Sequence, residues 1–239
     1  MKFDALLWDY DGTIVNSVPK NIAITKEIIA EVAPRLTGEN LPKYLRSEAE
    51  YHVANHQSEN WQDLYVNYYG MTEAEMLEAG PLWTPYQLAD DTPVELFEGM
   101  AEVIRQIDLP QGICSQNSAE NIRQLLTAHR LSEHFGAIVG YDDIPSDAQK
   151  PHPYSGVECL KRLLSDIQLQ PKTLLYVGDH EGDVLFARNI QRELGCDTRV
   201  VAAVVTYSGA EPLEWEHRPD WVVVTPGELL SIIGSIIKQ

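Results

Sequence analysis

Short apolar runs that each end in a polar turn constrain the fold of this chain most. The first run covers Phe3 to Trp8, is apolar apart from Asp4, and stops at Asp9-Tyr10-Asp11-Gly12-Thr13. Three later runs follow the same pattern and end at Ser115-Gln116-Asn117-Ser118, Gly178-Asp179 and Thr206-Tyr207-Ser208-Gly209. Such runs are typical of buried strands, and helical patterns lie between them. Strands that alternate with helices predict an α/β fold with a doubly wound parallel sheet.

Residues 17–90 interrupt this alternation. The segment is polar, rich in helix formers and aromatic residues, and lacks a convincing β-branched strand. Its candidate helices, separated by proline and glycine residues, are Pro19 to Val32, Tyr44 to Asn55, Trp61 to Tyr69 and Thr72 to Ala79. We therefore expect two domains: a core formed by residues 1–16 and 91–239, and a helical cap domain of residues 17–90 inserted after the first strand.

The charge balance limits the partners of the chain. Its 239 residues include 18 Lys and Arg against 36 Asp and Glu, which gives a formal net charge of -18. A chain this acidic repels nucleic acid and anionic membrane surfaces, so we expect neither as a partner. A small phosphorylated metabolite is still a suitable partner, because a bound divalent cation and one lysine can reverse the field locally.

The cysteines and the first residues indicate a soluble, cytoplasmic protein. Cys114, Cys159 and Cys196 are odd in number and form no CxxC pair, so reduced thiols are favoured over a disulfide framework or a zinc site. The N-terminus lacks a leader with a cleavage site, and no apolar run approaches the ~20 residues of a membrane helix. The sequence carries no signal for an oligomeric state.

Two acids stand at the end of the first run. Asp9 and Asp11 are two residues apart, so both carboxylates can point into one cleft, where one attacks while the other transfers protons. Gly12 would permit a tight turn, and the amides after it can donate to phosphate oxygens. Taken alone, this motif fits equally well with a solvated acidic turn that caps the next helix.

Three further strand ends or loops carry candidate site residues. Asp179 and Asp183 are four residues apart, would share one side of a helical turn, and could hold a hard cation such as Mg²⁺. Ser115 offers a hydroxyl and free backbone amides to an anion. Lys150 would supply an ammonium just before a proline-stiffened helix start. Each also has a simpler role: Asp183 as a complement to the helix dipole, Ser115 as a helix cap, and Lys150 as an exposed lysine.

Taken in order, Asp9, Ser115, Lys150 and Asp179 resemble the four motifs of haloacid dehalogenase superfamily hydrolases. Further similarity, partly to phosphoglycolate-phosphatase-like members, covers Thr13 to Ser17, Phe97 to Met100, Ala187 to Asn189, Val205 to Gly209 and Pro219-Asp220. The resemblance implies a Rossmann-like core. The chain departs from the family pattern at Asn16, where Asp is usual, and at Trp8, where Phe is usual; neither departure removes a catalytic group.

The resemblance implies a Mg²⁺-dependent phosphatase acting on phosphoric monoesters. Asp9 would attack phosphorus and form an aspartyl-phosphate, while Asp11 protonates the leaving alcohol and later deprotonates the water that hydrolyses the intermediate. Asp11 must therefore begin the reaction protonated. Ser115 and Lys150 would bind the oxygens of the transferring phosphoryl group.

The resemblance also implies the remaining contacts. Mg²⁺ would be held by the Asp9 carboxylate, the Asp11 backbone carbonyl and Asp179, with Asp183 bound directly or through water. The substrate would be a compact ester such as phosphoglycolate or a sugar phosphate. Its expected contacts in the core are Gly12, Thr13, Gln116 and Asn117. The resemblance does not cover the insertion, but an anionic substrate also needs a positive contact there, and Lys43 and Arg46 form a basic island in an acidic chain.

Other members of the same superfamily provide the alternatives. A 2-haloacid dehalogenase needs no metal and no proton-donating acid, and a phosphonate hydrolase replaces that acid with a small residue, so Asp11 disfavours both. A phosphomutase would keep every motif and is the strongest alternative. A catalytically idle binding or regulatory protein is disfavoured, because buried carboxylates without a task are costly to keep together.

Overall fold

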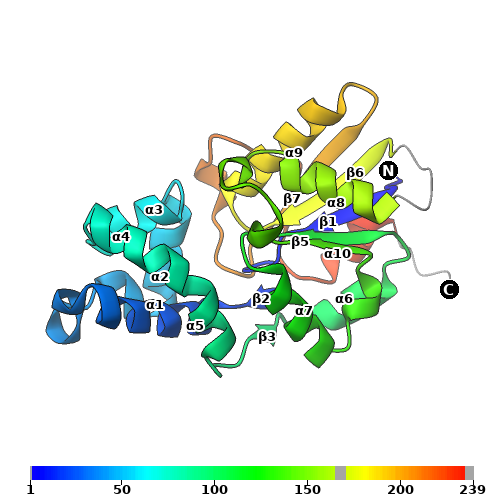
Figure 1. Cartoon of the computed structure of the whole chain (residues 1–239). Coiled ribbons are helices and arrows are strands. Elements are labelled where there is room, and N and C mark those ends of the chain that lie inside the picture. Colours follow the sequence, from blue (N-terminus) through cyan, green and yellow to red (C-terminus); the bar gives the residue numbers. More distant parts are fainter. Residues whose placement is uncertain (1, 165–170, 235–239) are drawn as a thin grey trace. The chain divides into compact units, whose positions relative to one another are not determined.

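The computed structural model describes residues 2–164 and 171–234, and the chain divides into two compact units (Figure 1). Unit 1 joins Met1–Asn16 to Leu96–Gln239, and unit 2 is Ser17–Glu95. Unit 2 begins at the residue where the inserted domain was predicted to begin and ends five residues after its predicted end. That unit 2 acts as a cap stays a prediction.

A six-stranded sheet forms the centre of unit 1 (Figure 1). Its strands are β1 (Ala5–Trp8), β4 (Gln111–Cys114), β5 (Ala137–Val139), β6 (Thr173–Gly178), β7 (Arg199–Val205) and β8 (Trp221–Val223). They follow the order β5-β4-β1-β6-β7-β8, and every pair is parallel. The chain thus builds outward from β1 in both directions, which confirms the predicted doubly wound parallel sheet.

Helices cover this sheet. Those of unit 1 are α6 (Met100–Gln106), α7 (Ala119–Ala128), α8 (Tyr154–Leu164), α9 (Glu181–Leu194) and α10 (Glu228–Ile233). Figure 1 shows α8 and α9 on one side of the sheet and α6 and α10 on the other. Because both faces are covered, all four residues of β1 are buried, and the strand is a continuous apolar run instead of an alternating one.

Trp8, one of the departures from the family pattern, is accommodated in this core. Its side chain is fully buried, and its indole Nε1 donates to Oε1 of Gln111 at 3.0 Å. Gln111 in turn donates from Nε2 to the backbone oxygen of Ile104 at 3.1 Å. The polar atom that Trp brings to the core is therefore satisfied, as a buried indole requires.

Unit 2 is helical and has an apolar core of its own. Its helices are α1 (Val18–Val32), α2 (Glu48–Gln57), α3 (Trp61–Asp63), a π-helical turn (Leu64–Tyr68), α4 (Glu73–Ala79) and α5 (Trp83–Ala89). A two-stranded sheet of β2 (Val15–Asn16) and β3 (Glu95–Leu96) is formed where the chain passes from one unit to the other. Within the described ranges, no helix is both long and apolar enough to span a bilayer.

One predicted helix of this unit was wrong and another helix was missed. The expected helix from Tyr44 to Asn55 is two elements, a 3₁₀ turn at Lys43–Leu45 and then α2, because Ser47 caps α2 by accepting a hydrogen bond from the Glu50 amide. Helix α5 was not predicted at all. Proline is tolerated in the first turn of a helix, so Pro85 does not prevent it.

Candidate active site

The carboxyl ends of three central strands bring the predicted acids together. Trp8, the last residue of β1, pairs with Ile113 of β4 and Val177 of β6, so the loops after these strands are neighbours. Asp9 follows β1 directly, and its amide donates to the Val177 carbonyl at 2.8 Å. Carboxylate oxygens of Asp9, Asp179 and Asp183 all lie within 4.8 Å of one another, and the three side chains are buried.

Lys150 completes this cluster. Its Nζ donates to Asp9 Oδ1 at 2.6 Å and to Asp183 Oδ1 at 2.9 Å. The rings of Tyr176 and Phe186 lie 5.3 Å from the same nitrogen, and only 9% of the lysine side chain is exposed. Burial alone would lower the pKa of Lys150, but the two aspartates outweigh it and raise the pKa, so the side chain stays charged.

Asp183 is held by protein donors on both of its oxygens. Oδ1 accepts from Lys150 and from the Tyr176 hydroxyl at 3.0 Å, and Oδ2 accepts from the amides of Asp179 and His180 at 3.2 and 3.1 Å. Burial opposes its ionisation, but Lys150 and these hydrogen bonds prevail and hold the pKa of Asp183 below its usual value. Asp183 is therefore an ionised anchor for Lys150 and for the loop after β6.

For the other two acids, Asp9 and Asp179, burial outweighs the groups that favour the ionised form. Burial raises the pKa of Asp9 to about 7, although Lys150 acts in the opposite direction. Burial and the charges of Asp9 and Asp183 raise the pKa of Asp179 well above its usual value. With all three acids ionised, Lys150 would leave two negative charges uncompensated. A buried set of oxygen ligands with such a deficit fits a hard divalent cation.

Gly12 makes room for this acid cluster. Its φ of +74° is the left-handed conformation that favours glycine, and a Cβ built there would lie 2.1 Å from Asp179 Oδ2. The predicted tight turn is present. Its close approach is to the carboxylate of Asp179, whereas the sequence interpretation invoked approach to a ligand. The contact of Gly12 with substrate stays a prediction.

Thr13, the next predicted substrate contact, has a fully buried side chain. Its Oγ1 has no hydrogen-bond partner among the described residues, and its carbonyl accepts from the Tyr207 hydroxyl at 2.6 Å. A contact with substrate through the side chain would therefore need a rearrangement of the loop, and the backbone amide already donates to the Tyr10 carbonyl at 3.3 Å. The contact of Thr13 with substrate stays a prediction.

The loop after β4 carries three predicted site residues. Ser115 is buried and its Oγ accepts from the Asn117 amide at 3.1 Å. Asn117 Nδ2 donates to Asp11 Oδ2 at 3.0 Å and to Oδ1 at 3.3 Å. Gln116 is exposed, and its Nε2 donates to the Lys150 carbonyl at 3.2 Å. The loop thus connects the acid of the first loop to the loop that carries the lysine.

Lys43 and Arg46 lie in unit 2 and are exposed. The Nζ of Lys43 lies 4.5 Å from the centre of the Tyr44 ring. Arg46 donates to the carbonyls of Leu41 at 2.8 Å and Glu39 at 3.3 Å, so its guanidinium has a local structural role. Their contact with substrate stays a prediction.

Sequence reasoning gave no role to Tyr176, Tyr207 and Ser208, all of which touch the site. Ser208 Oγ donates to Asp179 Oδ2 at 3.4 Å, and the Tyr207 ring packs on Phe97 with centroids 4.6 Å apart. The signal for Tyr207 and Ser208 was available, because they follow β7 in the same strand-end position as the other motifs. Tyr176 lies inside a strand and carries no such signal.

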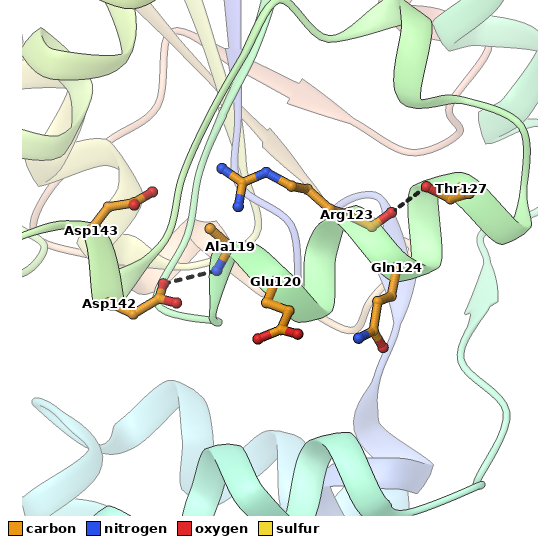
Figure 2. Close-up of a pocket in the computed structure, with 7 residues that line it drawn as sticks. All are labelled: Ala119, Glu120, Arg123, Gln124, Thr127, Asp142 and Asp143. Atoms are coloured by element: carbon orange, nitrogen blue, oxygen red, sulfur yellow. Dashed lines mark hydrogen bonds between the residues drawn. The ribbon is translucent and has the colours of Figure 1, made fainter.

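Figure 2 shows a surface cavity elsewhere in unit 1, along helix α7. Its lining consists of Ala119, Glu120, Arg123, Gln124, Thr127, Asp142 and Asp143. Asp142 caps the helix by accepting from the Ala119 amide at 2.9 Å. The acid cluster and Lys150 do not line this cavity, so it is distinct from the candidate active site.

The sequence also matches known families and proteins. The sequence model of a family described as haloacid dehalogenase-like hydrolase matches residues 6–194. A phosphoglycolate phosphatase from Synechococcus elongatus is 26% identical over 241 residues, which cover 98% of this chain and 99% of that protein. A pyrophosphatase PpaX from Bacillus thuringiensis is 24% identical over 251 residues, with 100% of both chains covered.

Solved structures show the same fold. A haloacid dehalogenase-like family hydrolase from Streptococcus pneumoniae superposes with a TM-score of 0.71 at 17% identity, covering 96% of this chain and 98% of that one. A Haemophilus somnus structure described as a predicted phosphoglycolate phosphatase gives 0.70 at 21% identity, with 97% and 98% covered.

Proposed function

Because this chain belongs to the haloacid dehalogenase-like hydrolase family, we propose that it is a Mg²⁺-dependent phosphatase that hydrolyses a small phosphate monoester through an aspartyl-phosphate. The membership itself confirms the predicted family and the prediction of an enzyme. The observation that best supports the proposed chemistry is the salt bridge of Lys150 to Asp9 and Asp183, inside a buried group of acids at the carboxyl end of β1.

The acids fit a divalent cation. Asp9 and Asp179 would be its carboxylate ligands, with the Asp11 carbonyl beside them. Asp183 would support the site, since its two oxygens already accept four hydrogen bonds. When bound, Mg²⁺ would neutralise charge on the acids and on the transferring phosphoryl group.

The residues of the chain divide the reaction between them. Asp9 attacks phosphorus, and Asp11 gives its proton to the leaving oxygen. Lys150 is already aligned with Asp9 Oδ1, so it can hold both the nucleophile and a phosphoryl oxygen. Ser115, buried at the end of β4, supplies a hydroxyl to a second phosphoryl oxygen.

The substrate class rests on size and charge. The two relatives named above carry names that specify phosphoglycolate and pyrophosphate, both of them small anions. A compact phosphoglycolate or sugar phosphate is our first choice, and inorganic pyrophosphate is the second, because similarity to the pyrophosphatase covers the whole chain. Such a metabolite agrees with a soluble cytoplasmic enzyme, the setting we infer.

A substrate panel tests the proposal. Purified enzyme is assayed for phosphate release from 2-phosphoglycolate, glucose 6-phosphate, pyrophosphate and p-nitrophenyl phosphate, with Mg²⁺ and with EDTA. We expect Mg²⁺-dependent release that EDTA abolishes. Absence of release from every compound would refute the phosphatase, and conversion of a sugar phosphate to an isomer without release would identify a phosphomutase instead.

A further inference from the structure

Asn117 lies between two predicted catalytic side chains. Its side chain is buried, with 5% of the residue exposed. Its Nδ2 donates to both oxygens of Asp11, and its backbone amide donates to the hydroxyl of Ser115. A single residue therefore links the acid after β1 to the serine after β4.

The orientation of the Asn117 side-chain amide is determined by its other end. Oδ1 accepts from the Ser118 amide at 2.8 Å and from Asn121 Nδ2 at 3.1 Å. If the amide were flipped, its NH₂ group would face the two donors from Ser118 and Asn121, and its oxygen would face the Asp11 carboxyl group. The only orientation that satisfies all these groups directs Nδ2 at Asp11.

The backbone of Asn117 is fixed as well. Its carbonyl accepts from the Tyr141 amide at 3.1 Å. The chain passes so close at Gly140 that a Cβ there would lie 2.7 Å from the Asn117 carbonyl oxygen. With its main chain and both ends of its side chain held, Asn117 offers a rigid donor at one position.

We propose that Asn117 is a positioning residue that holds the Asp11 carboxyl in the orientation needed for proton transfer, and that it does not contact the substrate. This role rests on the proposed phosphatase function and replaces the substrate contact predicted for Asn117. The side chain has little exposed surface for a ligand, and its polar atoms already bond to the protein.

The proton that Asp11 carries makes this role measurable. In the first step a bond forms between Asp9 and phosphorus, the bond from phosphorus to the leaving oxygen breaks, and the proton of Asp11 moves to that oxygen. In the second step a water oxygen bonds to phosphorus, its proton returns to Asp11, and the bond to Asp9 breaks. An alkoxide leaving group needs the first proton, whereas p-nitrophenolate is a weak base and leaves without it.

The test compares the two kinds of leaving group in Asn117→Ala and Asn117→Asp. The aspartate variant keeps an acceptor for Ser118 and Asn121 but loses the donor to Asp11. In both variants we expect kcat for 2-phosphoglycolate, or for glucose 6-phosphate if the wild type prefers it, to fall about 10- to 100-fold with little change in KM. The first-turnover burst of p-nitrophenolate, which precedes the step that needs Asp11 as a base, should fall less than about threefold.

Asn121→Ala is the matched control, because it removes one bond to Asn117 Oδ1 and leaves Nδ2 in contact with Asp11. This variant should change the rates measured with the two esters by the same factor. Three results would overturn the proposal. A p-nitrophenolate burst that slows as much as turnover of the preferred ester in the Asn117 variants would reduce Asn117 to a loop support. A rise in KM alone would restore it as a substrate contact, and wild-type activity in Asn117→Asp would exclude the donor. A wild-type enzyme inactive on every ester would instead refute the proposed function, and the positioning role with it.

Discussion

Units 1 and 2 bury different kinds of polar group. Unit 1 buries three carboxylates and a lysine at one end of its sheet. Residues 17–95, all of which the structure describes, bury no carboxylate, lysine or arginine, and their buried polar side chains are the neutral ones of Ser17, Asn21, Thr25, Ser58 and Gln87. A neutral group can be satisfied by a single hydrogen bond, as where Gln87 donates to Asn21. Buried charge is far more costly and indicates chemistry more than stability.

The comparison predicts that substitutions in the acid cluster reduce activity much more than stability. The largest effect should come from Asp9→Asn, which removes the nucleophile but keeps the shape of the side chain. Turnover should fall more than about 10³-fold, as loss of a covalent nucleophile does. Thermal unfolding should change little, because Lys150 keeps its bond to Asp183.

Phosphate release and circular dichroism melting of the same preparation check this prediction. Mass spectrometry of the wild type quenched in acid during turnover should also detect a phosphorylated Asp9. A folded Asp9→Asn variant with near-normal turnover would show that another residue attacks phosphorus.

The two acids after β6 should separate activity from stability. Asp179→Ala should weaken the apparent Mg²⁺ affinity by at least about tenfold with little loss of stability, because the structure gives this acid few donors. Asp183→Ala leaves Lys150, Tyr176 and two amides without an acceptor, so it should destabilise unit 1 by about 3 kcal/mol.

Mg²⁺ titrations of activity and urea unfolding of both variants measure the two effects. Asp183→Asn serves as the control, since it keeps one acceptor oxygen and should recover part of the lost stability. If Asp183→Ala weakened Mg²⁺ affinity more than Asp179→Ala, the assignment of ligand and anchor would be reversed.

The exposed cations of unit 2 should have a smaller effect. If Arg46 contacts the distal group of the substrate, Arg46→Ala should raise KM for the best small ester several-fold and leave p-nitrophenyl phosphate, which lacks that group, nearly unchanged. The melting temperature of the variant is the control, because Arg46 also holds the carbonyls of Leu41 and Glu39. Equal changes for both esters would remove Arg46 from the site.

The sheet and the acid cluster could be predicted because one rule places them. Apolar runs that end in polar residues mark parallel strands, and parallel strands in neighbouring positions bring Asp9, Ser115 and Asp179 to the same edge. The rule depends on strand positions alone and needs no knowledge of side-chain orientation.

The contacts within the site depend on orientation and could not be predicted. The bond from Asn117 to Asp11 requires that Ser118 and Asn121 hold the opposite end of the amide, which no local pattern reveals. In unit 2, the start of α2 depends on the hydrogen bond from the Glu50 amide to the Ser47 side chain. Helix α5 contains Pro85, and proline in a sequence is usually taken as a sign that a helix ends.

The smallest effect concerns a surface pair in unit 2, Arg35 and Glu75. Two donors of Arg35, with the Thr72 amide, lower the pKa of Glu75 from its usual 4.5 to about 2. Because the folded state lowers this pKa, the ionised carboxylate stabilises unit 2 at pH values above about 4.5. This contribution is lost as the pH falls toward about 2. Glu75→Gln should therefore lower the melting temperature slightly at neutral pH, and the difference from the wild type should shrink as the solution is acidified. Added salt should reduce the difference at neutral pH, since Arg35 is half exposed and its charge is screened. A difference that stayed constant from neutral to acid pH would mean that the capping geometry at Thr72, and not the charge, carries the effect.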